Sequence, residues 1–147
     1  MELRTQLSIA APPARVWAVF SEFDRWPEWN PFVTRAEGDF TRVGNQVRIT
    51  AGGQSFRPTI TAYEAGRLLR WRGKLFLGGI FSGEHSFRLV DNGDGTTTFH
   101  QDEDFGGLLL PLLRKKLNTE TRAGFNAANL ALRERVEEQL GPGKLVI

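Results

Sequence analysis

The chain opens with an alternation of polar and mainly apolar side chains over residues 2–9. This period of two predicts a β-strand with one buried face. The proline pair 12–13 ends the strand, and a short helix is expected from there because proline fits the first turn of a helix. Asp24 can cap a second short helix at 25–28, which ends before Pro31 because the residue preceding a proline avoids helical geometry.

From residue 32 onward the pattern becomes one of strands separated by turn-forming residues. The breaks contain Gly-Asn, Gly-Gly, Ala-Gly and Asn-Gly-Asp-Gly, all typical of tight turns. Because the connections are short, these strands are expected to pair sequentially in an antiparallel meander. The expected strands are 32–40, 45–51, 54–64, 67–76, 81–91 and 95–105.

The C-terminal part predicts one long amphipathic helix over residues 111–140, followed by a loose tail at 141–147. Apolar or small residues recur there at three- and four-residue steps. The middle of this stripe is small at Thr121, Gly124 and Ala128. Small residues either let the helix pack closely against its partner or leave room for a cavity.

A sheet with one apolar face needs a cover, and the C-terminal helix is long enough to provide it. We therefore expect a single α+β domain over residues 1–147. In it, a seven-stranded curved antiparallel sheet wraps around the long helix, and two short helices lie between the first and second strands.

The last hairpin indicates which side chains face the helix. If Asp91 pairs with Gly95, the opposed residues are Phe87–Phe99, His85–Gln101, Gly83–Glu103 and Phe81–Phe105. The phenylalanines mark this face as buried, so His85, Gln101 and Glu103 are expected to point inward as well.

A buried polar trio needs hydrogen-bond partners or water. It is either a satisfied network of the core or a polar spot that orients a ligand in an apolar pocket. His85 and Glu103 are candidates for general acid–base work, although no nucleophile with a matched base accompanies them. The candidate ligand-binding residues are Trp71, Phe81, His85, Phe87, Phe99, Gln101, Glu103, Leu117, Thr121, Gly124, Phe125 and Ala128.

Composition narrows the classes of function. A net charge of +2 without a long basic run gives no support to nucleic-acid binding. The absence of cysteine excludes disulfides and thiolate metal sites and favours a cytoplasmic location, and the two histidines have opposite parity, so no metal site is expected. No apolar run is long enough to span a membrane. The run Leu108–Leu113 is either the lid end of a cavity or a surface for a partner or membrane.

Several short motifs near the N-terminus resemble a known superfamily. They are Ile9-Ala10-Ala11-Pro12, Val16-Trp17, Phe23-Asp24, Trp26-Pro27 and Trp29-Asn30-Pro31. Together with the order of elements, they resemble the START-like (SRPBCC) domains, which include polyketide cyclases/dehydrases, pollen-allergen-like proteins and lipid-transfer domains. The resemblance implies a helix-grip fold with a deep hydrophobic cavity, and members that bind lipids, sterols or polyketides. The motif is structural, so no catalytic residue is carried over from it.

The residues and the resemblance together predict binding or carriage of a small hydrophobic ligand, such as a lipid, a polyketide or an aromatic-like molecule. The cavity would lie between the sheet and the C-terminal helix. The alternative is a polyketide cyclase/dehydratase-type enzyme that uses polar pocket residues. No cofactor is expected, and the expected partner is a small hydrophobic molecule.

Overall fold

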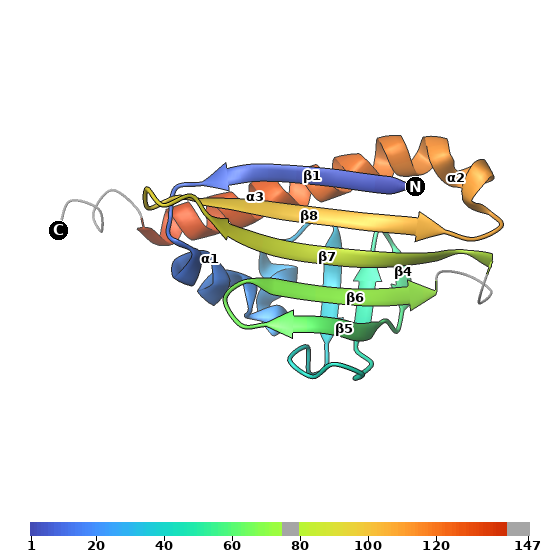
Figure 1. Cartoon of the computed structure of the whole chain (residues 1–147), viewed down its shortest axis with the longest axis horizontal. Coiled ribbons are helices and arrows are strands. Elements are labelled where there is room, and N and C mark those ends of the chain that lie inside the picture. Colours follow the sequence, from blue (N-terminus) through green and yellow to red (C-terminus); the bar gives the residue numbers. More distant parts are fainter. Residues whose placement is uncertain (75–79, 141–147) are drawn as a thin grey trace.

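A five-stranded antiparallel sheet curves along one side of the C-terminal helix in the computed structural model, which describes residues 1–74 and 80–140 (Figure 1). The strands occur in the order β1-β8-β7-β6-β5. Their bounds are β1 Glu2–Ile9, β5 Thr59–Glu64, β6 Leu68–Lys74, β7 Ser82–Asp91 and β8 Thr97–Gly106. The N-terminal strand therefore pairs with the last strand, and the other strands follow as a meander.

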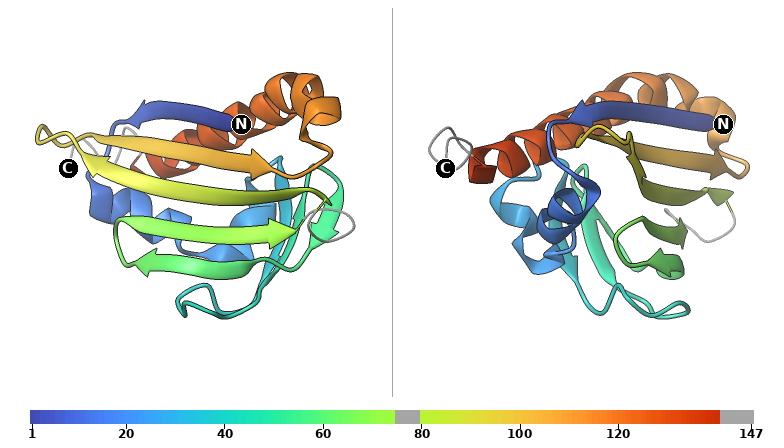
Figure 2. Two further views of the ribbon diagram at one scale, coloured as in Figure 1. Left: turned by 45° about the vertical axis from the view of Figure 1, so that its right-hand side comes forward. Right: turned by 60° about the vertical axis from the view of Figure 1, so that its left-hand side comes forward.

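A second, three-stranded antiparallel sheet runs across the first one (Figures 1 and 2). It contains β2 (Val33–Glu37), β3 (Arg48–Ala51) and β4 (Gln54–Phe56). An isolated bridge between Gln46 and Thr59 connects the two sheets. The described residues thus form eight strands in two sheets, which corrects the expected single sheet of seven.

The additional strand comes from the segment 54–64, for which the sequence predicts a single strand. This segment divides at Arg57-Pro58 into β4 and β5, which belong to different sheets. A proline has no N–H to donate to a sheet ladder, so it marks the point where the strand bends away. The expected strand 67–76 ends at Lys74 among the described residues, and its last two residues lie outside them.

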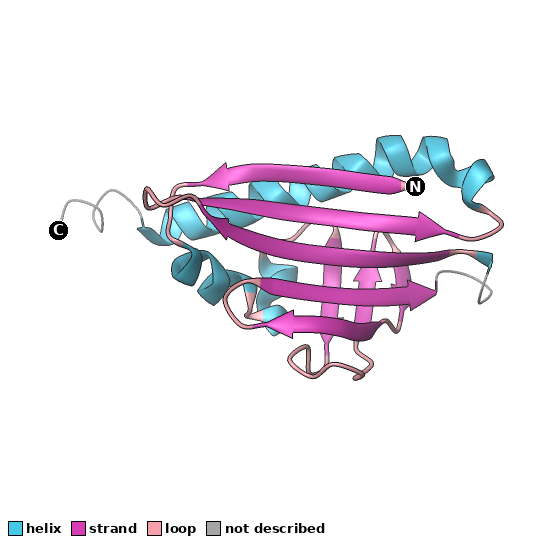
Figure 3. Cartoon of the chain, in the orientation of Figure 1, coloured by secondary structure: helices cyan, strands magenta, loops and turns pink. Residues whose placement is uncertain are grey.

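Two short helices lie between β1 and β2, as expected: α1 (Pro13–Phe20) and the 3₁₀-helix η1 (Phe23–Glu28) (Figure 3). The second helix begins at Phe23, so Asp24 lies in its first turn and is not the N-cap. The Trp26 indole Nε1–H donates to the Phe20 carbonyl at 2.7 Å, which fixes the fully buried Trp26 ring in the core.

The C-terminal helical segment is continuous but irregular. It consists of α2 (Leu110–Lys116), the π-helical turn η3 (Leu117–Thr121) and α3 (Arg122–Leu140). A π-helical turn inside an α-helix occurs frequently at functional sites. The buried side of the C-terminal helical segment continues along α3 through Phe125, Ala128 and Leu132. The expected loose tail at 141–147 lies outside the described residues.

The β7–β8 hairpin has a register that differs by two residues from the expected one. Asp91 pairs with Thr97, and His85 pairs with Glu103. The turn is longer because the Asn92 N–H donates to the Thr96 carbonyl at 3.1 Å. A shift of two residues leaves every side chain on its expected face, because the pleat has a period of two.

The apolar core divides into two clusters. The larger one surrounds the rings of Phe20, Trp26, Phe40, Trp71, Phe87 and Phe99. The smaller one, beside α2 and η3, contains Leu3, Phe81, Phe105, Leu110, Leu117 and Phe125. The exposed leucines of the run Leu108–Leu113 are Leu108 and Leu112, with 85% and 81% of their surface accessible.

Candidate functional site

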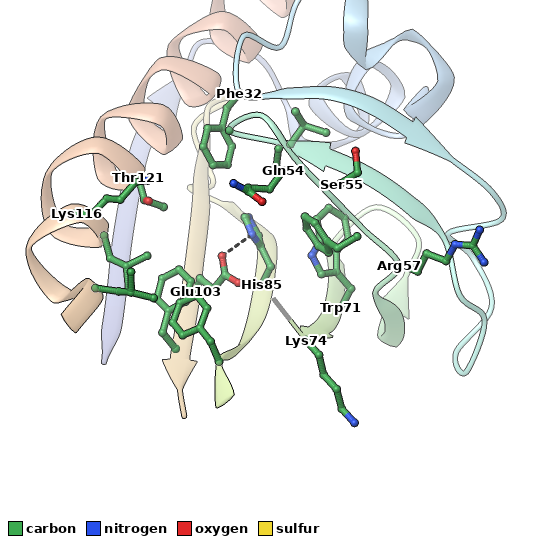
Figure 4. Close-up of a pocket in the computed structure, with 18 residues that line it drawn as sticks. Phe32, Gln54, Ser55, Arg57, Trp71, Lys74, His85, Glu103, Lys116 and Thr121 are labelled. Atoms are coloured by element: carbon green, nitrogen blue, oxygen red, sulfur yellow. Dashed lines mark hydrogen bonds and ion pairs between the residues drawn. The ribbon is translucent and has the colours of Figure 1, made fainter. Parts of the chain in front are cut away.

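A cavity of about 570 Å³, here called the main cavity, opens where the small sheet faces η3 and the ends of β7 and β8 (Figure 4). Phe32 and Phe56 contribute apolar surface from the side of the small sheet, and Phe81 and Phe105 from the side of the large sheet. The volume falls in the range typical of small-molecule sites. The cavity therefore has room for a ligand with an apolar body.

Half of the candidate ligand-binding residues line the main cavity. These are Trp71, Phe81, His85, Glu103, Leu117 and Thr121. Sequence reasoning missed the wall that comes from the small sheet, including Ala51, Gln54, Ser55, Phe56 and Arg57. It missed this wall because the segment 54–64 was assigned to one continuous sheet. Pro58 was the signal that could have located the bend.

The other candidates lie beside or behind the main cavity. Phe87, Phe99 and Ala128 surround a gap of only about 10 Å³ in the larger core cluster, and Gln101 reaches the same gap. Phe125 packs between the rings of His85 and Phe32, with centroid distances of 4.8 and 5.4 Å. These side chains support the cavity wall from outside.

Gly124 receives the ring of Phe32. A methyl group at position 124 would overlap the Phe32 side chain, so the glycine lets this ring lie close against the helix. The small residue therefore serves close packing at this point. The ring that it accommodates lines the main cavity on its other side.

His85 and Glu103 form the polar part of the inner wall. Nδ1 of His85 lies 3.1 Å from Oε1 of Glu103, and both side chains are almost completely buried. The imidazole stacks on Phe87 at a centroid distance of 4.4 Å and lies 5.2 Å from Trp71. Aromatic rings thus hold the imidazole in one orientation while the Glu103 carboxyl group reaches the cavity.

The other imidazole nitrogen leads into a buried network behind the cavity. His85 Nε2 lies 3.0 Å from Gln101 Oε1, and Gln101 Nε2 donates to Asn129 Oδ1 at 2.6 Å. Asn129 Nδ2 in turn donates to Thr5 Oγ1 at 2.9 Å. Gln101 therefore belongs to a satisfied network of the core, whereas Glu103 lines the main cavity.

Thr5 and Asn129 were absent from the sequence candidates. Thr5 occupies an inward position of β1 where its neighbours on the same face are apolar. Asn129 is 1% exposed and follows Phe125 by four residues on the same face of the helix. A polar residue on an otherwise apolar stripe was the available signal for each of them.

The rim of the main cavity carries positive charge. Arg57, Lys74 and Lys116 are exposed at its edge, and the structure gives them no ion pair with any described residue (Figure 4). Glu103 is the single acidic residue of the lining that the structure describes. Among residues 1–74 and 80–140, no group of three His, Cys, Asp or Glu side chains could hold a metal ion.

The fold and the cavity define a helix-grip domain with a ligand-sized space between sheet and helix. The chain belongs to the polyketide cyclase/dehydrase and lipid transport family, whose model matches residues 1–137. No curated protein sequence matches the chain. None of the described helices is long and apolar enough to cross a membrane.

Solved structures share the fold at low sequence identity. The Zhui aromatase/cyclase from Streptomyces sp. R1128 has a TM-score of 0.77 and 15% identity, with 97% of each chain covered. A hypothetical protein from Helicobacter pylori has a TM-score of 0.79 and 12% identity, covering 92% of this chain and 88% of that one. The di-domain aromatase/cyclase BexL has a TM-score of 0.69 and 13% identity, covering 90% of this chain and 46% of BexL.

Proposed function

We propose that this protein binds a small, mainly apolar molecule in the main cavity, with a polar group of the ligand at Glu103. The observation that carries the proposal is a cavity of about 570 Å³ that has phenylalanine walls and a carboxyl group on its inner side. Pockets of this kind bury the apolar body of a ligand and fix its orientation through a few polar groups.

The family supports the same conclusion. Its description combines polyketide cyclases and dehydrases with lipid transport, and both activities handle largely apolar molecules. A lipid, a polyketide or another aromatic-like molecule would place its body against Phe32, Phe81 and Phe105. The basic rim would favour ligands that carry a negative group outside the cavity.

A second candidate function is catalysis of the cyclase or dehydratase type. The observation that favours it is the hydrogen bond between His85 and Glu103, because Glu103 lines the cavity while His85 can exchange a proton with it. Replacing His85 with Gln would then abolish turnover of a polyketide-like substrate while ligand binding persists. Unchanged turnover in that variant would reject the catalytic role.

Two matched tryptophan variants test the binding function. Thr121→Trp fills the main cavity from the helix, whereas Ala127→Trp adds the same ring to an exposed position six residues later. In titrations of the purified protein with fatty acids, naphthols and hydroxylated polycyclic compounds, the first variant should lose binding. The second should bind as the unmodified protein does. Equal affinity in both variants would show that ligands bind elsewhere.

A further inference from the structure

The buried network behind His85 has only one arrangement of donors and acceptors. The Thr5 hydroxyl donates to the Gln101 carbonyl at 2.6 Å, because a carbonyl can only accept. Its single proton is then used, so Thr5 Oγ1 can only accept from Asn129 Nδ2. The Asn129 amide is thereby oriented with its Oδ1 toward Gln101.

The orientation of the Asn129 amide determines that of the Gln101 amide. The Gln101 amide in turn determines which nitrogen of the His85 imidazole carries a proton. Gln101 Nε2 lies 2.6 Å from Asn129 Oδ1 and 3.4 Å from the Phe125 carbonyl, and both of these atoms are acceptors. The other end of the Gln101 amide, Oε1, therefore faces His85 Nε2 at 3.0 Å. Since Oε1 only accepts, His85 Nε2 carries a proton.

Because Nε2 already carries a proton, one further proton is shared between His85 Nδ1 and Glu103 Oε1. Nδ1 and Oε1 lie 3.1 Å apart, and a hydrogen bond between them requires one proton. The proton is either on Nδ1, giving an imidazolium and a carboxylate, or on Oε1, giving a neutral imidazole and a carboxylic acid. In both forms the proton lies between Nδ1 and Oε1.

The second carboxyl oxygen of Glu103, Oε2, is the atom that a ligand can reach. Every buried side-chain nitrogen or oxygen in the described part of the chain has a hydrogen-bond partner, yet Oε2 makes no hydrogen bond there. It is therefore accessible, and Glu103 lines the main cavity. Gly83 provides its space, because a methyl group at that position would overlap Oε2.

Oε2 is an acceptor in both protonation forms, because the shared proton stays on the Oε1 side. The geometry points to a ligand that presents a hydrogen-bond donor to Glu103, namely a phenol, enol or alcohol on an apolar body. This inference rests on the proposed binding function and specifies the polar group of the ligand. Thr5, Asn129 and Gln101 act as positioning residues for it, since they fix the proton on His85 Nε2 without touching the cavity.

Two ligands of nearly the same shape test this preference by calorimetric titration. 2-Naphthol offers a hydroxyl donor, whereas 2-methoxynaphthalene offers only an acceptor. We expect 2-naphthol to bind about tenfold tighter or more, as a hydrogen bond to a buried carboxyl group predicts. In Glu103→Leu the preference should fall below about threefold. The control Glu120→Leu makes the same change at an exposed helix position outside the cavity lining and should retain the preference.

The outcomes separate the two proposals. Equal affinities of both compounds for the unmodified protein would leave the binding function intact and overturn the inference. A preference that survives in Glu103→Leu would also overturn it, because the donor would then bind elsewhere. Binding of neither compound would contradict the binding function, and the inference would fall with it.

Nitrogen-15 NMR of the full chain tests the network directly, without a ligand. The sequence has two histidines, and His100→Gln identifies the signals of His85. We expect His85 Nε2 to be protonated, and we expect Asn129→Leu to add a population with the proton on Nδ1 alone, because the Gln101 amide can then turn over. A neutral His85 with an unprotonated Nε2 in the unmodified protein would overturn the inference.

Discussion

The space between the sheet and its covering helices has two ends with opposite character. At the end covered by α1 and η1, the rings of Phe20, Trp26, Phe87 and Phe99 leave a gap of only about 10 Å³. At the end beside η3, the main cavity measures about 570 Å³ although its walls also carry phenylalanines. Aromatic content therefore does not distinguish a filled core from an open one.

The difference lies in what each covering element inserts. The short helices place Phe20 and Trp26 directly against β7, with centroid distances of 5.1 and 5.6 Å to Phe87. At the open end, the ring of Phe32 lies close against the helix at Gly124 and leaves the centre of the main cavity free. The polar pair His85–Glu103 lies at the boundary, with the imidazole against packed rings and the carboxyl group at the cavity.

The largest effect should come from removing a ring at the filled end. Phe87→Ala deletes a side chain in contact with several rings, and buried Phe→Ala changes typically cost about 3–5 kcal/mol of unfolding free energy. The half-buried Leu113 at the cavity rim is the control, because Leu113→Ala should cost less than about 1 kcal/mol. Urea unfolding measures both, and equal losses would contradict the distinction between the two ends.

The network behind His85 should have the next largest effect on stability. Asn129→Leu leaves the Gln101 amide N–H without its main acceptor, and an unsatisfied buried donor costs about 1–3 kcal/mol. The exposed helix position Asn126 provides the control, since Asn126→Leu should change stability by less than about 0.5 kcal/mol. Urea unfolding again measures the effect. If Asn129→Leu leaves the stability unchanged, water has replaced the lost hydrogen-bond partner of Gln101.

A third prediction concerns the carboxyl group rather than stability. In Gly83→Ala the new methyl group displaces Glu103 Oε2, so affinity for a hydroxylated ligand should fall about tenfold while the fold persists. Gly106→Ala is the matched control, because the nearest atom to a methyl group there is Ser82 Oγ at 4.0 Å. If the two alanine variants bind a naphthol equally well, the position of Oε2 is unimportant for the ligand.

The smallest effect should come from His100, on the face of β8 opposite to the main cavity. Burial, followed by the charge of Arg88, lowers the pKa of His100 below its ordinary value of 6.5. The unfolded chain therefore binds more protons near and below that pH, and His100 reduces stability as the pH falls through it.

The variant His100→Gln removes this contribution. Between about pH 7.5 and about pH 5, its melting temperature should decrease slightly less than that of the unmodified protein. Thermal unfolding across this range measures the difference. A steeper decrease in the variant would show that the protonated form of His100 is favoured by folding.

Periodicity in the sequence was enough to predict much of this structure. The inward positions of His85, Gln101 and Glu103 followed from the alternation along β7 and β8, and they survived a register error of two residues. The resemblance of the opening motifs indicated both the family and the helix-grip fold. The family model over residues 1–137 confirms the family, and the structure shared with the Zhui aromatase/cyclase confirms the fold.

What the sequence did not reveal are contacts between residues far apart in the chain. The ring of Phe32 packs against the helix at Gly124, and neither residue carries a local sequence pattern that points to the other. Thr5 bonds to Asn129 across the sheet–helix interface for the same reason. Whether a group of phenylalanines encloses a cavity or fills it depends on such contacts.

The central claim is that the main cavity binds a small, mainly apolar molecule. Native mass spectrometry of the protein purified from its own cells tests it most directly, followed by solvent extraction and identification of what is released. We predict a stoichiometric apolar passenger, which is lost in Thr121→Trp and retained in Ala127→Trp. A passenger that remains in Thr121→Trp, or a protein that binds no apolar compound when titrated, would contradict the claim.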